Sequence, residues 1–551
     1  VFARGGFDCV LGNPPWEQVQ LSEEEFFASR APSIAALSGA RRKAAIDALV
    51  SEIPALFAEF QSAKRLYEAT SVYARDSERY SLSAVGKLNT YALFAETALA
   101  IRAPQGRTGI IVPSGVATDD STKAFFAHLA DGRLVSLVDF ENRDALFPGV
   151  HRSYKFSLLT LGPAARAELA FFLTAPEQLK DARRRFSLAP EEFALLNPNT
   201  RTCPVFRSTA DAELTKKIYA RVPVLWDERR PDGNPWGLSF ATLFHMSNDS
   251  GLFRTAARRG ELADPLPLYE AKMIHQFDHR WATYAGAQAT LADDDEADGA
   301  RDSTPAEKAC PDYRVSPRYW VERAEVEARL QDKAWRRGWL MGWRDICRST
   351  DERTVIAAVV PRTAVGHKMP LLLSARPAAE LCCLLGNLDA LCLDFVARQK
   401  VGGTSLTYFY LKQLTVLPPT AYTPEALAFI VPRVLELSYT ADDLAPFHND
   451  VVVENPAFDP RPPSERGQPF PWNPERRAQL RAELDACYAR LYGLTRDELR
   501  YLLDPSEVMG ADYPSETFRV LKDKEIRQHG EYRTQRLVLA AWDRLQTGEL
   551  R

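Results

Sequence analysis

The stretch Phe-Asp-Cys-Val-Leu-Gly-Asn-Pro-Pro-Trp, residues 7–16, reads as a short buried strand that ends in a rigid polar turn. Val10 and Leu11 supply the apolar strand residues, and Gly12 lets the backbone turn. The two prolines fix two φ angles and lack N–H donors, so the carbonyl groups of the turn stay free to accept hydrogen bonds. The Asn13 carboxamide beside such carbonyls suits an amino group, and Trp16 offers a face to a planar base. These residues predict a chemical site.

The motif Asn13-Pro14-Pro15-Trp16 resembles the catalytic motif of DNA methyltransferases that methylate amino groups, most closely the N6-adenine type. In that family the motif lies at the tip of the fourth strand of a sheet that binds S-adenosylmethionine (SAM). The resemblance implies that these four residues are catalytic and that Asn13 also contacts the cofactor. If the Asn13 side-chain oxygen and the Pro14 carbonyl accept both N6–H bonds, the nitrogen lone pair becomes localised for attack on the methyl group. The target base must then flip out of the duplex.

Composition sets limits on the class of protein. A chain of 551 residues is long enough for more than one domain, and its formal net charge of −4 restricts any nucleic-acid surface to a local patch. The eight cysteines include no CxxC pair, so we expect neither a metal site nor a disulfide scaffold. With no signal peptide or long apolar span, we expect a cytoplasmic location and no membrane association.

The sequence lacks the Gly-rich turn that chiefly binds SAM in the family it resembles. Gly5-Gly6 does not have the required pattern, and Gly402-Gly403 lies in a different context. We therefore expect that this chain is a segment of a longer polypeptide. The main SAM-binding motif is expected upstream of residue 1.

Residues 1–175 are predicted to form an α/β catalytic domain, the C-terminal part of a Rossmann-like SAM-dependent methyltransferase sheet. Residues 22–83 show helical spacing and are predicted to be a helical insertion. A helix over residues 88–103 and an apolar strand over residues 108–114 make a crossover unit of a parallel sheet. The resemblance to the methyltransferases implies that Asn89 and Tyr91 lie near the cofactor.

Two further strands are predicted over residues 134–140 and 154–161, with a Phe-Pro loop between them. This arrangement resembles the element with which adenine methyltransferases place an aromatic ring against the flipped base, and Phe147 is the candidate. The alternative is that Phe147 is a core residue that anchors the loop. Nearby His151, Arg152 and Lys155 are candidates for contacts with DNA.

Residues 176–221 are predicted to be a connector, and residues 222–420 a mixed α+β target-recognition domain. The latter mixes aromatic, amide and cationic side chains, as suits contacts with phosphates and base edges. It resembles the recognition region of large restriction-modification enzymes. The candidates for DNA contacts are Lys272, His275, Arg280, Lys400 and Thr404. Gly402-Gly403 allows close approach to DNA, although a plain connector between helices explains this loop equally well.

Two weaker patterns occur in the same region. His275 and His279 have the spacing of metal ligands on a helix, but no His-Glu-x-x-His motif is present, so a structural or DNA-contacting role is favoured. Asp264, Glu270 and Lys272 only faintly resemble a nuclease cluster, which is disfavoured. Residues 290–307 are predicted to be an acidic, mobile loop.

Residues 381–397 are predicted to be one buried helix, and residues 421–551 a helical C-terminal region. Amphipathic spacing predicts helices over residues 424–439, 474–491, 495–503 and 527–545.

The sequence thus favours a site-specific adenine N6 methyltransferase that acts on double-stranded DNA by base flipping. A restriction-modification or phage-defence system is the expected setting, and other subunits of such a system are further candidate partners. Two alternatives stay open. One is methylation of another amine or amide, such as cytosine N4 or a protein glutamine, although cytosine N4 enzymes commonly carry Ser where this chain has Asn13. The other is a DNA-recognition or assembly module that does not catalyse alone.

Overall fold

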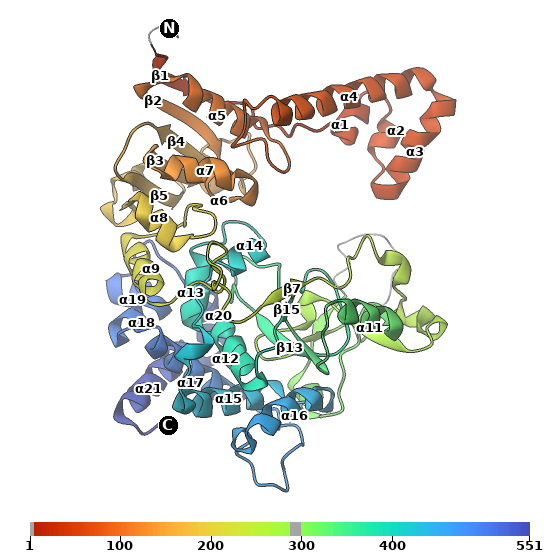
Figure 1. Ribbon diagram of the computed structural model, residues 1–551, viewed down its shortest axis with the longest axis vertical. Coiled ribbons are helices and arrows are strands. Elements are labelled where there is room, and N and C mark those ends of the chain that lie inside the picture. Colours follow the sequence, from red (N-terminus) through yellow and green to blue (C-terminus); the bar gives the residue numbers. More distant parts are fainter. Residues whose placement is uncertain (1–4, 287–298, 551) are drawn as a thin grey trace. The chain divides into compact units, whose positions relative to one another are not determined.

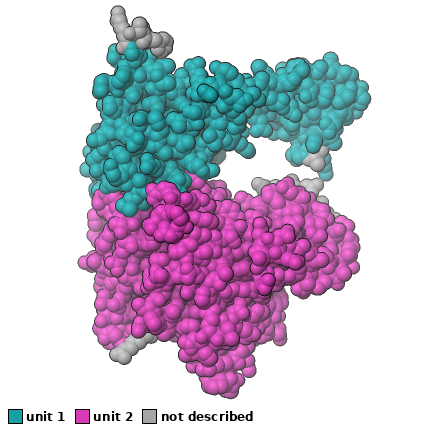
Figure 2. All heavy atoms as spheres, in the orientation of Figure 1, with its two compact units in different colours: residues 1–209 teal, residues 210–551 magenta. Residues whose placement is uncertain are grey.

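The computed structural model describes residues 5–286 and 299–550 of the chain (Figure 1). They belong to two compact units, residues 1–209 and 210–551 (Figure 2). The predicted connector over residues 176–221 is divided between the two units. Residues 290–298 of the predicted acidic loop lie outside the described residues. The rest of the predicted loop is corrected, because it contains strand β10 (Arg301–Asp302) and the start of helix α10 (Pro305–Ala309).

The first unit contains a six-stranded mixed sheet with the order β1-β2-β4-β3-β5-β6. Strand β1 is parallel to β2, and β4 runs antiparallel between β2 and β3. Strand β5 is parallel to β3, and β6 is antiparallel to β5. The C-terminal ends of β1, β2 and β3 therefore lie at the same edge of the sheet. The strand bounds are β1 Phe7–Gly12, β2 Arg102–Pro113, β3 Leu134–Glu141, β4 Lys155–Leu161, β5 Ala167–Leu173 and β6 Phe186–Leu188.

Strand β1 lies at one side of this sheet and is mostly exposed, so the prediction of a buried strand is wrong. The Leu11 side chain is 84% exposed. Within the described residues β1 pairs only with β2, which leaves its other edge without a strand. Two glycines allow the close approach of β1 and β2. A Cβ atom added at Gly6 would lie 2.6 Å from the Ile101 carbonyl oxygen. One added at Gly106 would lie 2.6 Å from the Phe7 carbonyl oxygen.

The predicted insertion contains four helices, which extend from the sheet part of the first unit (Figure 1). Phe26 and Phe27 of α1 pack with Phe60 of α4, with ring centroids 5.4 and 5.2 Å from Phe60. This small core gives the insertion its own apolar centre. The helices of the first unit are α1 Glu23–Ala28, α2 Pro32–Ala35, α3 Gly39–Glu52, α4 Pro54–Asp76, α5 Thr90–Ile101, α6 Gly115–Thr118, α7 Lys123–Ala130 and α8 Pro190–Leu196.

The described part of the second unit contains three small sheets, with strand orders β13-β12-β15-β7, β11-β8-β14 and β10-β9. Their inward side chains form one large apolar core around Leu268, Leu340 and Val365. The strands are β7 Ser239–Ala241, β8 Pro265–Tyr269, β9 Ala282–Thr283, β10 Arg301–Asp302, β11 Trp320–Glu322, β12 Trp339–Trp343, β13 Ala357–Pro361, β14 Ala364–Val365 and β15 Leu371–Leu373.

The helix predicted over residues 381–397 is two helices, α12 and α13, which meet at Ala390. Ala390 has extended backbone angles, φ −71° and ψ 142°. Two carboxylates explain the position of the break. Asp389 at the end of α12 accepts the Ala357 N–H of β13 at 2.9 Å, and Asp394 in the first turn of α13 accepts the Thr354 N–H at 2.8 Å. The end of α12 and the start of α13 are therefore held against β13 and the residues just before it.

The C-terminal region is helical, as predicted, but residues 527–545 belong to two helices, α20 and α21. The chain turns between them at Gly530, whose φ is +76°. None of the helices in residues 5–286 and 299–550 combines the length and apolarity needed to cross a membrane. The remaining helices are α9 Thr209–Arg221, α10 Pro305–Ala309, α11 Arg323–Asp332, α12 Ala378–Asp389, α13 Leu391–Arg398, α14 Tyr408–Leu411, α15 Pro424–Ser438, α16 Ala445–Glu454, α17 Pro474–Leu491, α18 Arg496–Leu503, α19 Pro505–Met509, α20 Arg519–His529 and α21 Arg533–Thr547.

Candidate active site

The turn Asn13–Trp16 follows the C-terminal end of β1 and is held by the start of α5. The Thr90 hydroxyl donates to the Pro15 carbonyl at 2.7 Å and accepts the Glu17 N–H at 3.0 Å. Thr90 also donates its backbone N–H to the Glu17 carbonyl at 2.9 Å. Sequence reasoning missed Thr90, whose only signal is its place at the first turn of a predicted helix.

The turn leaves its polar groups free on the outer side. Asn13 is exposed and Pro14 half-buried. Among residues 5–286 and 299–550, neither the Asn13 carboxamide nor the Pro14 carbonyl has a hydrogen-bond partner. Two acceptor oxygens are therefore available next to each other at the end of a strand. Such a pair can accept two N–H bonds from one amino group.

Trp16 is half-buried and packs against an apolar cluster on the sheet. Its indole N–H donates to the Ile111 carbonyl of β2 at 3.3 Å. The cluster contains the buried side chains of Phe140 and Phe156, whose rings stack with centroids 5.4 Å apart. One side of the Trp16 ring is thus fixed by the sheet, while part of the ring stays open to solvent.

Phe147 borders the same cluster from the loop after β3. Its ring meets Phe156 edge to face at 5.2 Å and is 47% exposed. The buried Asn142 carboxamide organises this loop. It donates to the carbonyls of Phe147 at 3.1 Å and Val150 at 2.8 Å, and it accepts the Phe147 N–H at 2.9 Å. Trp16 and Phe147 therefore share one apolar cluster, which the sequence alone could not establish.

Asn89 and Tyr91 have structural roles in the chain described. The Asn89 side-chain oxygen caps α5 by accepting the Tyr91 N–H at 3.2 Å. The Tyr91 side chain is buried, and burial, with a contribution from nearby Asp119, raises its pKa well above the ordinary value. The Tyr91 ring belongs to the core of the first unit, and its contact with the cofactor stays a prediction.

The predicted DNA contacts of the first unit differ in how accessible they are. His151 and Arg152 are exposed, and the His151 ring lies 2.7 Å from the Ser153 hydroxyl. Lys155 is half-buried and pairs with Glu141 at 3.0 Å. The charge of Lys155 is therefore balanced by Glu141, and its contact with DNA stays a prediction.

Two of the predicted DNA contacts of the second unit, Arg280 and Lys400, are buried. Arg280 is fully buried and donates to the carbonyls of Lys308 and Thr440, each at 2.8 Å. Lys400 is 3% exposed, its amine lies 4.5 Å from the centre of the Tyr219 ring, and burial lowers its pKa well below the ordinary value. Both predicted contacts are corrected, because these side chains stabilise the interior.

The other candidates of the second unit are partly or fully accessible. Lys272 is half-buried with its amine 5.3 Å from the Tyr284 ring centre, and Thr404 is exposed. His275 is half-buried against Trp281, with ring centroids 4.3 Å apart. Burial, together with nearby arginines such as Arg344, lowers the pKa of His275 well below its ordinary value.

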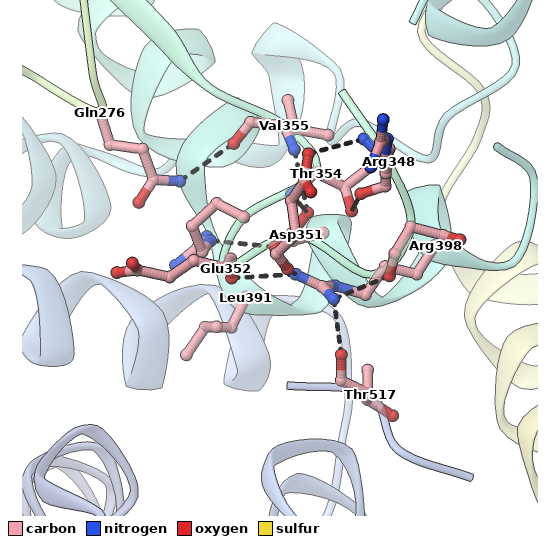
Figure 3. Close-up of polar contacts among 12 residues, drawn as sticks. Gln276, Arg348, Asp351, Glu352, Thr354, Val355, Leu391, Arg398 and Thr517 are labelled. Atoms are coloured by element: carbon pink, nitrogen blue, oxygen red, sulfur yellow. Dashed lines mark hydrogen bonds and ion pairs between the residues drawn. The ribbon is translucent and has the colours of Figure 1, made fainter. Parts of the chain in front are cut away.

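Many other cations of the second unit also serve the fold. Arg398 donates to the carbonyls of Ser349, Asp351, Glu352 and Thr517 at 2.6–2.9 Å, which ties a loop to the C-terminal region (Figure 3). Buried arginines with carbonyl partners leave fewer cations for a nucleic-acid surface. The mixture of cations and aromatics read from the sequence is therefore largely structural.

Neither weak pattern forms a site. His279 pairs with Asp443 at 3.0 Å, and Asp264 pairs with Arg323 at 2.5 Å. Glu270 accepts the Tyr284 hydroxyl at 2.8 Å. In the described part of the chain no group of His, Cys, Asp and Glu side chains has the arrangement of a metal site.

Comparisons with protein-family models and with curated proteins find no match. Among solved structures, the chain is similar to the type IIL restriction-modification enzyme MmeI in complex with DNA, with 9% identity and a TM-score of 0.34, covering 88% of this chain and 54% of that one. It is also similar to the type IIG restriction endonuclease BpuSI, with 11% identity and a TM-score of 0.24, covering 69% of this chain and 51% of that one.

A third similar structure is a nuclease-deletion mutant of the type ISP restriction-modification enzyme LlaGI in complex with a DNA substrate mimic. The identity is 9%, the TM-score is 0.34, and the match covers 72% of this chain and 40% of that one. The chain spans about half the length or less of these enzymes. At these scores the similarity assigns neither a fold nor an activity to this chain.

Proposed function

We propose that this protein transfers a methyl group from SAM to adenine N6 in double-stranded DNA. One observation carries the proposal. The exposed Asn13 carboxamide and Pro14 carbonyl lie at a strand end, and the neighbouring Trp16 packs on the same apolar cluster as Phe147. Ligands of α/β sheets bind beyond the carboxyl ends of parallel strands, which is where this turn lies.

The chemistry follows from the acceptors and aromatic faces present. Asn13 and Pro14 accept the two N6–H bonds of a flipped adenine, which draws the nitrogen lone pair out of the ring system. Trp16 and Phe147 supply faces for the extruded base, with stacking worth roughly 1–3 kcal/mol. Thr90 holds the turn through the Pro15 carbonyl, so that the acceptors keep their positions.

SAM supplies the transferable methyl group when it is bound. The described residues fit the amino-group end of this reaction, but they offer few groups to the cofactor, because Tyr91 is buried and Asn89 caps a helix. We therefore propose that the main SAM-binding motif lies on further strands beside the open edge of β1. The exposed Leu11 on that strand supports this placement.

The setting of the reaction is a separate part of the proposal. A restriction-modification or phage-defence role in the cytoplasm, with other subunits of such a system as additional partners, rests on the sequence resemblance of residues 222–420 to recognition regions. A module that recognises DNA without catalysing alone is the second candidate. The position of Asn13 favours the enzyme, because a recognition module has no need of two free acceptors at a strand end.

The test uses the natural protein that contains this chain, tritiated SAM and plasmid DNA. We expect Asn13→Ala to lower methyl transfer at least a hundredfold, because the Asn13 acceptor is lost, while DNA affinity changes less than twofold. Asn449→Ala, at an exposed residue of α16, is the matched control. Mass spectrometry of the nucleosides identifies N6-methyladenine, and sequencing locates the modified site. Unchanged turnover in Asn13→Ala, or a product methylated at cytosine N4, would contradict the proposal.

A further inference from the structure

A cavity of about 370 Å³ lies in the first unit, between residues 18–21, residues 86–88 and one face of α4. This volume falls in the range of small-molecule and nucleotide sites. Its floor is apolar, since Phe60 and Leu88 are 4% and 5% exposed. Its rim carries amide, aromatic and charged side chains, so the cavity has an apolar floor and a polar rim.

Backbone pairing connects the cavity to the candidate active site. Gln18 pairs with Asn89, and the Val19 N–H donates to the Leu88 carbonyl at 2.9 Å. Thr90, the residue after Asn89, donates its hydroxyl hydrogen to the Pro15 carbonyl. Only Glu17 lies between Trp16 and Gln18, which lines the cavity, so the cavity adjoins the turn along the chain.

The charge of the cavity is weakly positive. Its cations are Lys64, Arg75 and Lys87, and its anions are Glu23 and Glu68. Lys64 lies 4.0 Å from Glu68, so these two charges largely cancel. In the described part of the chain neither Arg75 nor Lys87 forms an ion pair with a carboxylate.

Arg75 is held in place by the chain that forms one wall of the cavity. Its guanidinium donates to the Gly86 carbonyl at 2.7 Å and to the Ala84 carbonyl at 3.3 Å. Carbonyls orient a guanidinium without neutralising it, so the positive charge remains available to an anion. Lys87 follows directly on the same wall and is exposed.

Tyr67 adds an aromatic face to the rim, and it is 37% exposed. We propose that this cavity binds a nucleotide of the target DNA strand next to the flipped adenine, with its phosphate at Arg75 and Lys87 and its base against Tyr67. This inference rests on the proposed function. A phosphate anion suits the two cations, whereas the sulfonium and ammonium groups of SAM do not.

The experiment measures DNA binding by fluorescence anisotropy, with a 30-base-pair duplex that carries the methylated site. We expect Lys87→Gln to weaken binding about tenfold and to lower the slope of log affinity against log salt by about one. Lys43→Gln, an exposed lysine of α3 outside the cavity, should bind within twofold of the wild type. Tyr67→Ala should weaken binding about fivefold without changing the salt slope.

A neutral methylphosphonate locates the contact. Placed at the phosphate beside the target adenine, it should abolish the difference between the wild type and Lys87→Gln, and placed five nucleotides away it should not. Equal binding by Lys87→Gln and the wild type would overturn the inference. Weaker SAM binding with unchanged DNA binding would overturn it as well, because the cavity would then serve the cofactor.

Failure of the proposed function gives a different result. If no site is methylated, a 30-nucleotide single strand replaces the duplex as the probe. Loss of affinity in Lys87→Gln but not in Lys43→Gln would then support the nucleotide site without methyl transfer. Equal binding of the single strand by the two variants would overturn the cavity inference in that case too.

Discussion

Among single side chains, Thr90 has the most direct influence on the candidate site, because its hydroxyl joins the start of α5 to the turn after β1. We expect Thr90→Val to lower the rate of methyl transfer about tenfold with little change in stability, since the turn loosens while the helix persists. The matched control is Thr97→Val on the same helix, which loses only a bond to the Leu93 carbonyl at 2.9 Å. Single-turnover kinetics measure the effect, and equal rates for the two variants would contradict it.

A second prediction concerns Asp139 of β3 and how the free energy of unfolding depends on pH. Burial raises its pKa from 3.8 to about 6, although hydroxyl donors, such as Ser157 at 2.8 Å, oppose the shift. The native state therefore holds this proton more tightly than the unfolded state. The stabilisation that this proton contributes is fully present below pH ~4 and is lost as the pH rises through about 6.

A pKa difference of about 2 corresponds to roughly 3 kcal/mol. We expect the free energy of unfolding of the wild type, relative to Asp139→Asn, to fall by roughly this amount between pH 4 and pH 7. Urea denaturation of the first unit measures it. Asp120→Asn, at an exposed residue with an ion pair to Lys123, is the control. A constant difference between the wild type and Asp139→Asn across this range would refute the prediction.

Among the elements, the loop after β3 depends on one buried side chain. Asn142→Ala removes two donated hydrogen bonds and one accepted bond within the loop that carries Phe147. We expect a loss of stability of about 2–3 kcal/mol and a several-fold increase in KM for DNA, because the aromatic face is displaced. Asn197→Ala is a matched control, at a buried asparagine that donates to the Thr202 carbonyl at 2.7 Å. If Asn197→Ala increased KM as much as Asn142→Ala does, the effect would reflect a general loss of stability and not the position of Phe147.

The boundaries of the helices and strands show where the local pattern of apolar residues was sufficient to predict them. Apolar periodicity predicted the helix–strand unit of α5 and β2 and the strands β3 and β4, because each has a continuous buried face. It did not predict the break at Ala390, which depends on carboxylates that accept backbone N–H groups far along the chain. Nor did it predict the exposure of β1, since an apolar strand has the same composition at the centre and at the side of a sheet.

For the whole molecule, binding to DNA should depend strongly on salt despite the net charge of −4. A local group of cations releases counterions from the phosphates whatever the total charge of the protein. We expect log affinity to fall linearly with log salt between 50 and 200 mM, with a slope of about −3 or steeper. Anisotropy titrations at four salt concentrations test this. Affinity that does not change with salt would contradict a phosphate-contacting surface.

The sequence by itself determined the chemistry of the turn at Asn13, because two prolines and a carboxamide fix their donors and acceptors through covalent structure alone. It also predicted β1–β4, α5 and the helical character of residues 22–83 through the spacing of apolar residues, but not β5, β6 or α6–α8. Only the tertiary structure decided which cations are accessible. Arg280 and Lys400 read as surface charges, yet both are buried, because carbonyl groups and an aromatic ring from distant segments surround them. Burial depends on contacts between such segments, and residue type does not specify them.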